Sequence, residues 1–213
     1  MNKSKQTIAI LILSVICIIL LGFRVQHTGR ITYIFLIWNL FLAFIPYGIS
    51  LKMDVSKSKW KLLAYGGIWL AFFPNAPYLI TDFVHLPHRT SPTFWIDLSL
   101  LTMFSVAGFM LATLSLKKVH QVLHQFFNRL ISNVILINLI LLSGFGIYLG
   151  RILRWNSWDI VTNPKGLFVD IVHIFQSKKM LFEAGGFTLL FGLLIGSVYY
   201  SYHLTINKET VSN

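Results

Sequence analysis

The chain has 213 residues, of which 55% are hydrophobic, and its mean hydropathy is +0.69. This composition excludes an ordinary soluble domain, because a soluble fold of this length cannot hide so much apolar surface. The formal net charge of +11 comes without any Lys/Arg-dense stretch interleaved with aromatic residues. The charge therefore predicts contact with anionic membrane lipid and no nucleic-acid partner.

Six mostly apolar stretches without Asp, Glu, Lys or Arg fill most of the sequence. Each is 17 to 24 residues long, and a helix of roughly 20 residues crosses the hydrocarbon core of a bilayer. The pattern predicts an all-α polytopic membrane protein, a single domain over residues 1–213 with six transmembrane helices. The predicted spans are residues 7–23, 31–51, 62–81, 98–116, 130–150 and 184–207.

The first stretch follows Lys3 and Lys5 but has no small-x-small cleavage site before Arg24. It is therefore expected to be a retained signal anchor. The single cysteine, Cys17, lies inside this stretch and allows no intrachain disulfide.

The distribution of basic residues predicts the orientation of the chain. With the N-terminus inside, the inner segments hold 10 Lys and Arg residues, whereas the two short outer loops hold only Arg24, Arg30 and Arg89. Short cytoplasmic loops carry the excess of basic residues. Both termini are thus expected in the cytoplasm of a bacterial cell, with the protein in the plasma membrane.

In this topology, the polar side chains gather in the outer half. Asn39 and Asn75 lie within spans two and three, Asp82 and Asp97 bracket the next outer loop, and a second polar group follows span five. These residues predict an outward-facing pocket built from spans two to five and the loops after spans three and five.

Span three contains two prolines three residues apart, Pro74 and Pro77, at membrane depth. Each proline removes a backbone donor and disfavours helix in the residue before it. Lipid cannot satisfy the freed carbonyls. The helix is expected to bend here and to turn Asn75 toward protein, either as a plain structural kink or as the wall of a ligand pocket.

The run Gly146–Asp159 places Arg151 and Arg154 one helical turn apart, so that both can point the same way. Their expected partners are either the carboxylates of Asp82 and Asp97 or a phosphate group of a lipid or anionic substrate. We expect Asp82, Asp97 and Asp159 to meet around one of these arginines in a single cluster, because three carboxylates at a membrane interface need a cation among them.

Four strings carry a resemblance to a known family: Trp38–Ala43, Phe72–Leu86, Trp95–Asp97 and Gly146–Asp159. Together they make the chain similar to the bacterial membrane family called domain of unknown function 1361, over roughly residues 31–205. The resemblance implies a multi-pass membrane protein and no established activity. The polar motif positions of the family fall here on Asn39, Asn75, Asp82, His85, Asp97, Arg151, Arg154, Asn156 and Asp159.

The longest connection, Ile160 to Glu183, contains Asn163-Pro164, a helix start signal, followed by apolar residues at helical spacing. It predicts an amphipathic helix on the outer surface between spans five and six. That helix is expected to be an interfacial anchor or a lid over the pocket.

No His-Glu-x-x-His, Walker or dinucleotide motif is present, so no catalytic residue, metal or cofactor is predicted. Three functions stay open. The chain binds or processes a polar or lipid-linked envelope molecule in the outer pocket, it is a noncatalytic scaffold or accessory subunit, or it is a small-solute transporter. Whether it is an enzyme is left open.

Cysteines introduced at Ser91 and Ser157 test the predicted topology. Both should react with a membrane-impermeant thiol reagent in whole cells, because both positions lie on the outer side. Protection of both positions would reverse the orientation and place the pocket on the inner face.

Overall fold

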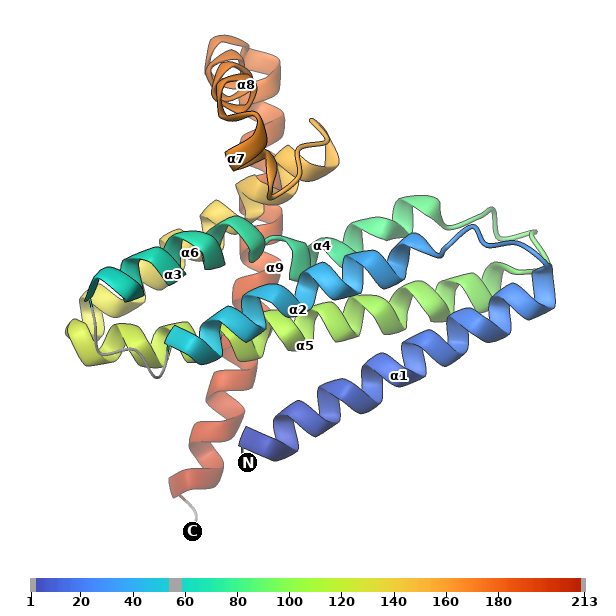
Figure 1. Ribbon diagram of the computed structural model, residues 1–213, viewed down its shortest axis with the longest axis horizontal. Coiled ribbons are helices and arrows are strands. Elements are labelled where there is room, and N and C mark those ends of the chain that lie inside the picture. Colours follow the sequence, from blue (N-terminus) through green and yellow to red (C-terminus); the bar gives the residue numbers. More distant parts are fainter. Residues whose placement is uncertain (1–2, 54–58, 212–213) are drawn as a thin grey trace.

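The computed structural model describes residues 3–53 and 59–211, and its long segments are helical (Figure 1). The N-terminal residues 1–2, the C-terminal residues 212–213 and the middle of the inner loop predicted around Lys57 lie outside the described residues. The elements are α1 (Lys3–Thr28), α2 (Phe35–Met53), α3 (Lys59–Phe72), α4 (Asn75–Tyr78), the 3-10 helix η1 (Leu79–His85), α5 (Phe94–Phe126), α6 (Arg129–Arg151), α7 (Asp159–Thr162), α8 (Pro164–Gln176) and α9 (Lys178–Val211).

Within the described part of the chain, five helices are long and apolar enough to cross a membrane: α1, α2, α5, α6 and α9. They coincide with five of the six predicted stretches, and the all-α class is confirmed. The remaining stretch, residues 62–81, is divided among α3, α4 and η1, so α3 by itself has only 14 residues.

Helix α5 is the centre of the bundle. It packs against α1, α2, α4, η1, α6 and α9, and its buried residues include Leu101, Phe104 and Leu111. In Figure 1, α1, α2 and α5 run side by side, whereas α9 crosses them and packs along α6. The start of α1 meets the last third of α9, where the Gln6 amide donates a hydrogen bond of 3.0 Å to the Tyr202 hydroxyl. The two termini therefore lie at the same end of the bundle.

A polar junction holds α2, α3 and α5 together inside this core. The indole N–H of Trp69 donates to the Ser115 hydroxyl at 2.7 Å, and Ser115 donates to the Pro46 carbonyl at 3.1 Å. Trp69 also stacks on Phe73, with ring centroids 4.4 Å apart. Since Trp69 and Ser115 are almost fully buried, these hydrogen bonds satisfy groups that water does not reach.

The break in the third stretch follows from its prolines, as predicted. The amide N–H of Ala76 donates to Phe73 at 3.1 Å, not to Phe72, whose carbonyl would be its partner in a regular helix. The side-chain amide of Asn75 donates to that freed Phe72 carbonyl at 2.8 Å. The bend and the inward turn of Asn75 are confirmed, and the chain leaves the bend as a short helix and a 3-10 turn.

Two glycines let the broken segment lie deep between its neighbours. A Cβ at Gly108 of α5 would overlap the Ala76 carbonyl oxygen, and a Cβ at Gly146 of α6 would lie 2.5 Å from Cγ of Pro74. The bend is therefore wedged between α5 and α6 at distances that only glycine allows.

Gly108→Ala tests this wedge. The added methyl meets a backbone oxygen that cannot rotate away, so we expect the free energy of unfolding to fall by about 1–3 kcal/mol, as for other overpacked sites. Chemical unfolding in detergent, followed by circular dichroism, measures the change. Gly48→Ala in α2 is the matched control, because nothing lies within 4 Å of its Cβ position. Equal stability of the two variants would mean that the close approach is not a constraint.

Candidate functional site

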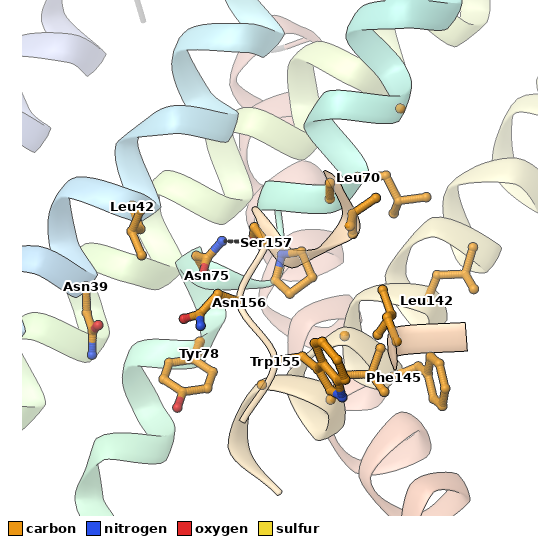
Figure 2. Close-up of a pocket in the computed structure, with 18 of the residues that line it drawn as sticks. Asn39, Leu42, Leu70, Asn75, Tyr78, Leu142, Phe145, Trp155, Asn156 and Ser157 are labelled. Carbon is orange, nitrogen blue, oxygen red and sulfur yellow. Dashed lines mark hydrogen bonds between the residues drawn. The ribbon is translucent and has the colours of Figure 1, made fainter. Parts of the chain in front are cut away.

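A pocket of about 560 Å³ lies between α2, α3, α4, α6 and the segment that follows α6 (Figure 2). Its polar wall contains three of the predicted site residues, Asn39, Asn75 and Asn156, together with Ser157 and Tyr78. Its apolar wall includes Leu42 of α2, Leu70 of α3, Leu142, Phe145 and Leu149 of α6, and Leu167 of α8. The volume falls within the usual range for small-molecule sites.

The bend in the third stretch builds one side of this pocket. Pro74, Asn75 and Tyr78 all line it, and the Asn75 amide donates a second hydrogen bond, of 2.8 Å, to the Ser157 hydroxyl. Figure 2 shows this bond joining α4 to the chain beyond α6. Asn75 thus supplies a donor to the Phe72 carbonyl and also holds Ser157 on the opposite side of the pocket.

An ion pair between Asp82 and Arg151 lies next to two residues of the pocket lining, Asn39 and Tyr78. Asp82, which is 1% exposed, accepts a hydrogen bond of 3.0 Å from the Asn39 amide and another of 3.0 Å from the Arg151 guanidinium. Arg151 also donates to the Thr81 carbonyl and lies over the Tyr78 ring, with its Cζ 5.0 Å from the ring centroid. Neither Asp82 nor Arg151 lines the pocket, but Asn39 and Tyr78 connect the pair to it.

The charge on Asp82 depends on these neighbours. The Asn39 amide and the Arg151 guanidinium each donate a hydrogen bond to one of its carboxylate oxygens. They thereby compensate a carboxylate that lies almost fully out of contact with water.

Asp97 belongs to a different network. Its carboxylate pairs with Arg24 at 3.0 Å and accepts a hydrogen bond of 2.9 Å from the Thr93 hydroxyl. Arg24 is 5% exposed, donates to the Arg30 carbonyl at 2.8 Å and covers the Tyr33 ring at 4.7 Å. This pair fastens the end of α1 to the start of α5.

Asp159 belongs to a third, local arrangement. It accepts hydrogen bonds from the backbone N–H of Asn156 at 2.7 Å and from the Asn156 amide at 3.2 Å. The backbone hydrogen bond lowers the pKa of the Asp159 carboxyl. The expectation of one cluster that contains Asp82, Asp97 and Asp159 is therefore wrong, because each carboxylate has its own set of donors.

The paired orientation expected for Arg151 and Arg154 is also wrong. Helix α6 ends at Arg151, with Ile152 as its C-cap, and Arg154, two residues beyond the cap, has a left-handed backbone with a φ of 62°. The Trp155 N–H then donates back to the Leu149 carbonyl at 3.0 Å. This turn leaves the Arg154 side chain exposed and returns Trp155, Asn156 and Ser157 to the pocket.

His85 lies outside the pocket. Its side chain is exposed, its ring meets the edge of the Phe35 ring with centroids 5.2 Å apart, and its carbonyl accepts a hydrogen bond of 2.7 Å from Tyr33. Among the residues that the structure describes, no three His, Cys, Asp or Glu side chains form a group that could hold a metal ion.

The sequence pattern did not identify three residues that take part in these interactions. Arg24 was assigned to an outer loop because the apolar stretch ends at Phe23, but α1 continues to Thr28. No sequence pattern marks Thr93 as a partner of Asp97. The sequence position of Trp155 fits an aromatic belt at the membrane interface, yet this side chain lines the pocket and donates to Asp170 of α8 at 2.9 Å. The available signal for Arg24 was a single arginine directly after an apolar stretch, a position from which a helix can continue for another turn.

Comparison with known proteins places the chain in a family. The family model described as protein of unknown function, DUF1361, matches residues 38–197. The chain belongs to this family. The match covers α2 through most of α9, and it includes every residue that lines the pocket. No curated protein and no solved structure matches the chain.

Asp82→Asn, Asp97→Asn and their combination test whether the two arginine pairs are separate. Each single change leaves a buried guanidinium without its carboxylate and should cost about 3–5 kcal/mol of unfolding free energy. The cost should be smaller for Asp82, whose partner Arg151 keeps 20% of its side-chain surface exposed. Because the pairs share no partner, the two losses should add to within about 0.5 kcal/mol.

Unfolding in detergent measures all three variants, and Asp159→Asn is the control for removal of an acidic residue from a solvated turn. A large departure from additivity would mean that Asp82 and Asp97 act in one network.

Proposed function

We propose that this protein binds a polar or lipid-linked envelope molecule in the pocket between α2, α4, α6 and the segment after α6. The observation that carries the proposal is the division of the pocket into an amide-rich side, with Asn39, Asn75 and Asn156, and an extended apolar side. A cavity with a few convergent polar groups on an apolar wall is typical of a ligand site. An amphiphile satisfies both sides at once.

The residues that line the pocket suit the binding of a ligand better than its chemical conversion. Among the described residues that line the pocket there is no Asp, Glu, His, Cys, Lys or Arg. Ser157 accepts a hydrogen bond from Asn75, which is a donor in that bond and not a base. A serine without a base to take its proton is a weak nucleophile.

The proposal includes the membrane arrangement. The continuous segment of α3, α4 and η1 spans residues 59–85 and serves as a sixth, broken crossing, which gives six spans and both termini on the cytoplasmic side of a bacterial plasma membrane. Broken helices at membrane depth are tolerated where they line a cavity. Helix α8, with Phe168 and Phe175 exposed, lies at the outer interface as an amphipathic helix.

A noncatalytic scaffold is the second candidate. It is favoured by the internal pairing of the buried charges, Arg24 with Asp97 and Arg151 with Asp82. In that case the pocket is a structural gap. A small-solute transporter is a further alternative, which a water path from the pocket to the opposite face would favour.

Gly67→Phe tests the binding proposal. Gly67 lines the pocket and has open space around its Cβ position, so a phenyl ring there fills the cavity without a backbone clash. We expect the amount of small molecule that co-purifies with the protein, measured by mass spectrometry, to fall at least tenfold. Gly66→Phe is the matched control, because Gly66 has the same open surroundings and does not line the pocket. Equal ligand content in both variants would favour the scaffold.

A further inference from the structure

The three asparagines of the pocket have chemically fixed orientations. The amide nitrogen of Asn39 faces the Asp82 carboxylate, that of Asn75 faces the Phe72 carbonyl, and that of Asn156 faces the Asp159 carboxylate. Each of these partners only accepts hydrogen bonds. An amide flipped the other way would bring two acceptors together, so at least one N–H of each asparagine is held by the protein and its orientation is fixed.

The carbonyl oxygens of the same amides are the groups left for a ligand. No hydrogen bond from another described residue reaches Oδ1 of Asn39, Asn75 or Asn156. Each of these side chains lines the pocket. Ser157 accepts from Asn75 and keeps its own hydroxyl proton for a further partner. The pocket lining therefore offers three amide oxygens as acceptors together with the hydroxyls of Ser157 and Tyr78, and it favours a ligand that can donate several hydrogen bonds.

The lack of charged side chains in the pocket lining narrows the class of ligand further. The described residues that line the pocket include no Asp, Glu, His, Lys or Arg, and Arg151, which donates to Asp82 and to the Thr81 carbonyl, lies outside the lining. A phosphate would find three acceptor oxygens and no cation in the lining. An ammonium would lose its hydration shell beside neutral amides.

We propose that the pocket recognises an uncharged headgroup with several hydroxyls, such as a glycerol or sugar group, and that it prefers this group when it carries a hydrocarbon chain. The hydroxyls donate to the asparagine oxygens, and the chain lies along Leu142, Phe145 and Leu149 of α6. This assignment rests on the proposed function, because it names the class of molecule that the same pocket binds. Trp38 and Trp155, which also line the pocket, offer flat apolar faces to the carbon face of a polyol.

Native mass spectrometry of the full chain, released from phosphatidylcholine nanodiscs, tests the assignment with five probes. Monooleoylglycerol carries the hydroxyls, methyl oleate has a similar chain without them, oleyl phosphate is anionic, oleylamine is cationic, and glycerol lacks the chain. Monooleoylglycerol should bind at least tenfold more tightly than methyl oleate, oleyl phosphate or oleylamine. Among these four long-chain probes, it is the one whose headgroup is uncharged and has hydroxyl donors.

Single substitutions identify the acceptors. Asn75→Ala and Asn156→Ala should each weaken monooleoylglycerol binding about fivefold or more and leave methyl oleate unchanged. The second variant is the safer one, because the Asn156 backbone keeps its bond to Asp159. Asn138→Ala is the matched control and should have no effect. Asn138 lies on α6, donates to the Val134 carbonyl of its own helix at 2.8 Å and does not line the pocket.

The outcomes separate the two proposals. If all oleyl probes bind equally and Gly67→Phe blocks them all, the pocket binds lipid chains and the hydroxyl assignment is wrong. Tighter binding of oleyl phosphate or oleylamine would also overturn it. If glycerol binds as tightly as monooleoylglycerol, the proposed preference for a hydrocarbon chain is wrong and the ligand is a free polyol. If no probe binds, or Gly67→Phe changes nothing, both the assignment and the proposed binding function are wrong.

Discussion

The arrangement of this protein depends on how one broken helix finds partners for its backbone. At the break around Pro74 and Pro77, the Ala76 N–H donates to the Phe73 carbonyl, so the Phe72 carbonyl loses the backbone donor of a regular helix. Asn75 supplies that donor and also holds Ser157. Gly108 and Gly146 let the segment lie deep enough for this. The segment after the break contributes Pro74, Asn75 and Tyr78 to the pocket lining.

Much of the fold could be predicted from the sequence, since membrane helices are long, apolar and separated by charges. The stretches at residues 7–23 and 130–150 lie within α1 and α6, and Asn163-Pro164 marks the start of α8, where the Asn163 side chain accepts from the Gly166 N–H at 3.1 Å. The bend and the role of Asn75 followed from the chemistry of proline.

The pairing of charges could not be predicted in this way. Sequence distance does not say which arginine reaches which carboxylate, and Arg24 was hidden by the assumption that a helix ends where its apolar run ends. Arg154 misled for a local reason. Helical spacing from Arg151 holds only while the helix continues, and α6 stops at Arg151. Of the nine candidate residues, the pocket wall contains Asn39, Asn75 and Asn156.

The charged and the neutral polar residues thus have different tasks. Asp97 with Arg24 and Asp82 with Arg151 each join segments far apart in the chain, and buried charges of this kind are tolerated only when paired and hydrogen-bonded. Asn39 lies at the boundary between the two groups, since its nitrogen donates to the Asp82 carboxylate and its side chain lines the pocket. The ion pair between Asp82 and Arg151, which joins η1 to the end of α6, therefore also fixes the direction in which this amide points.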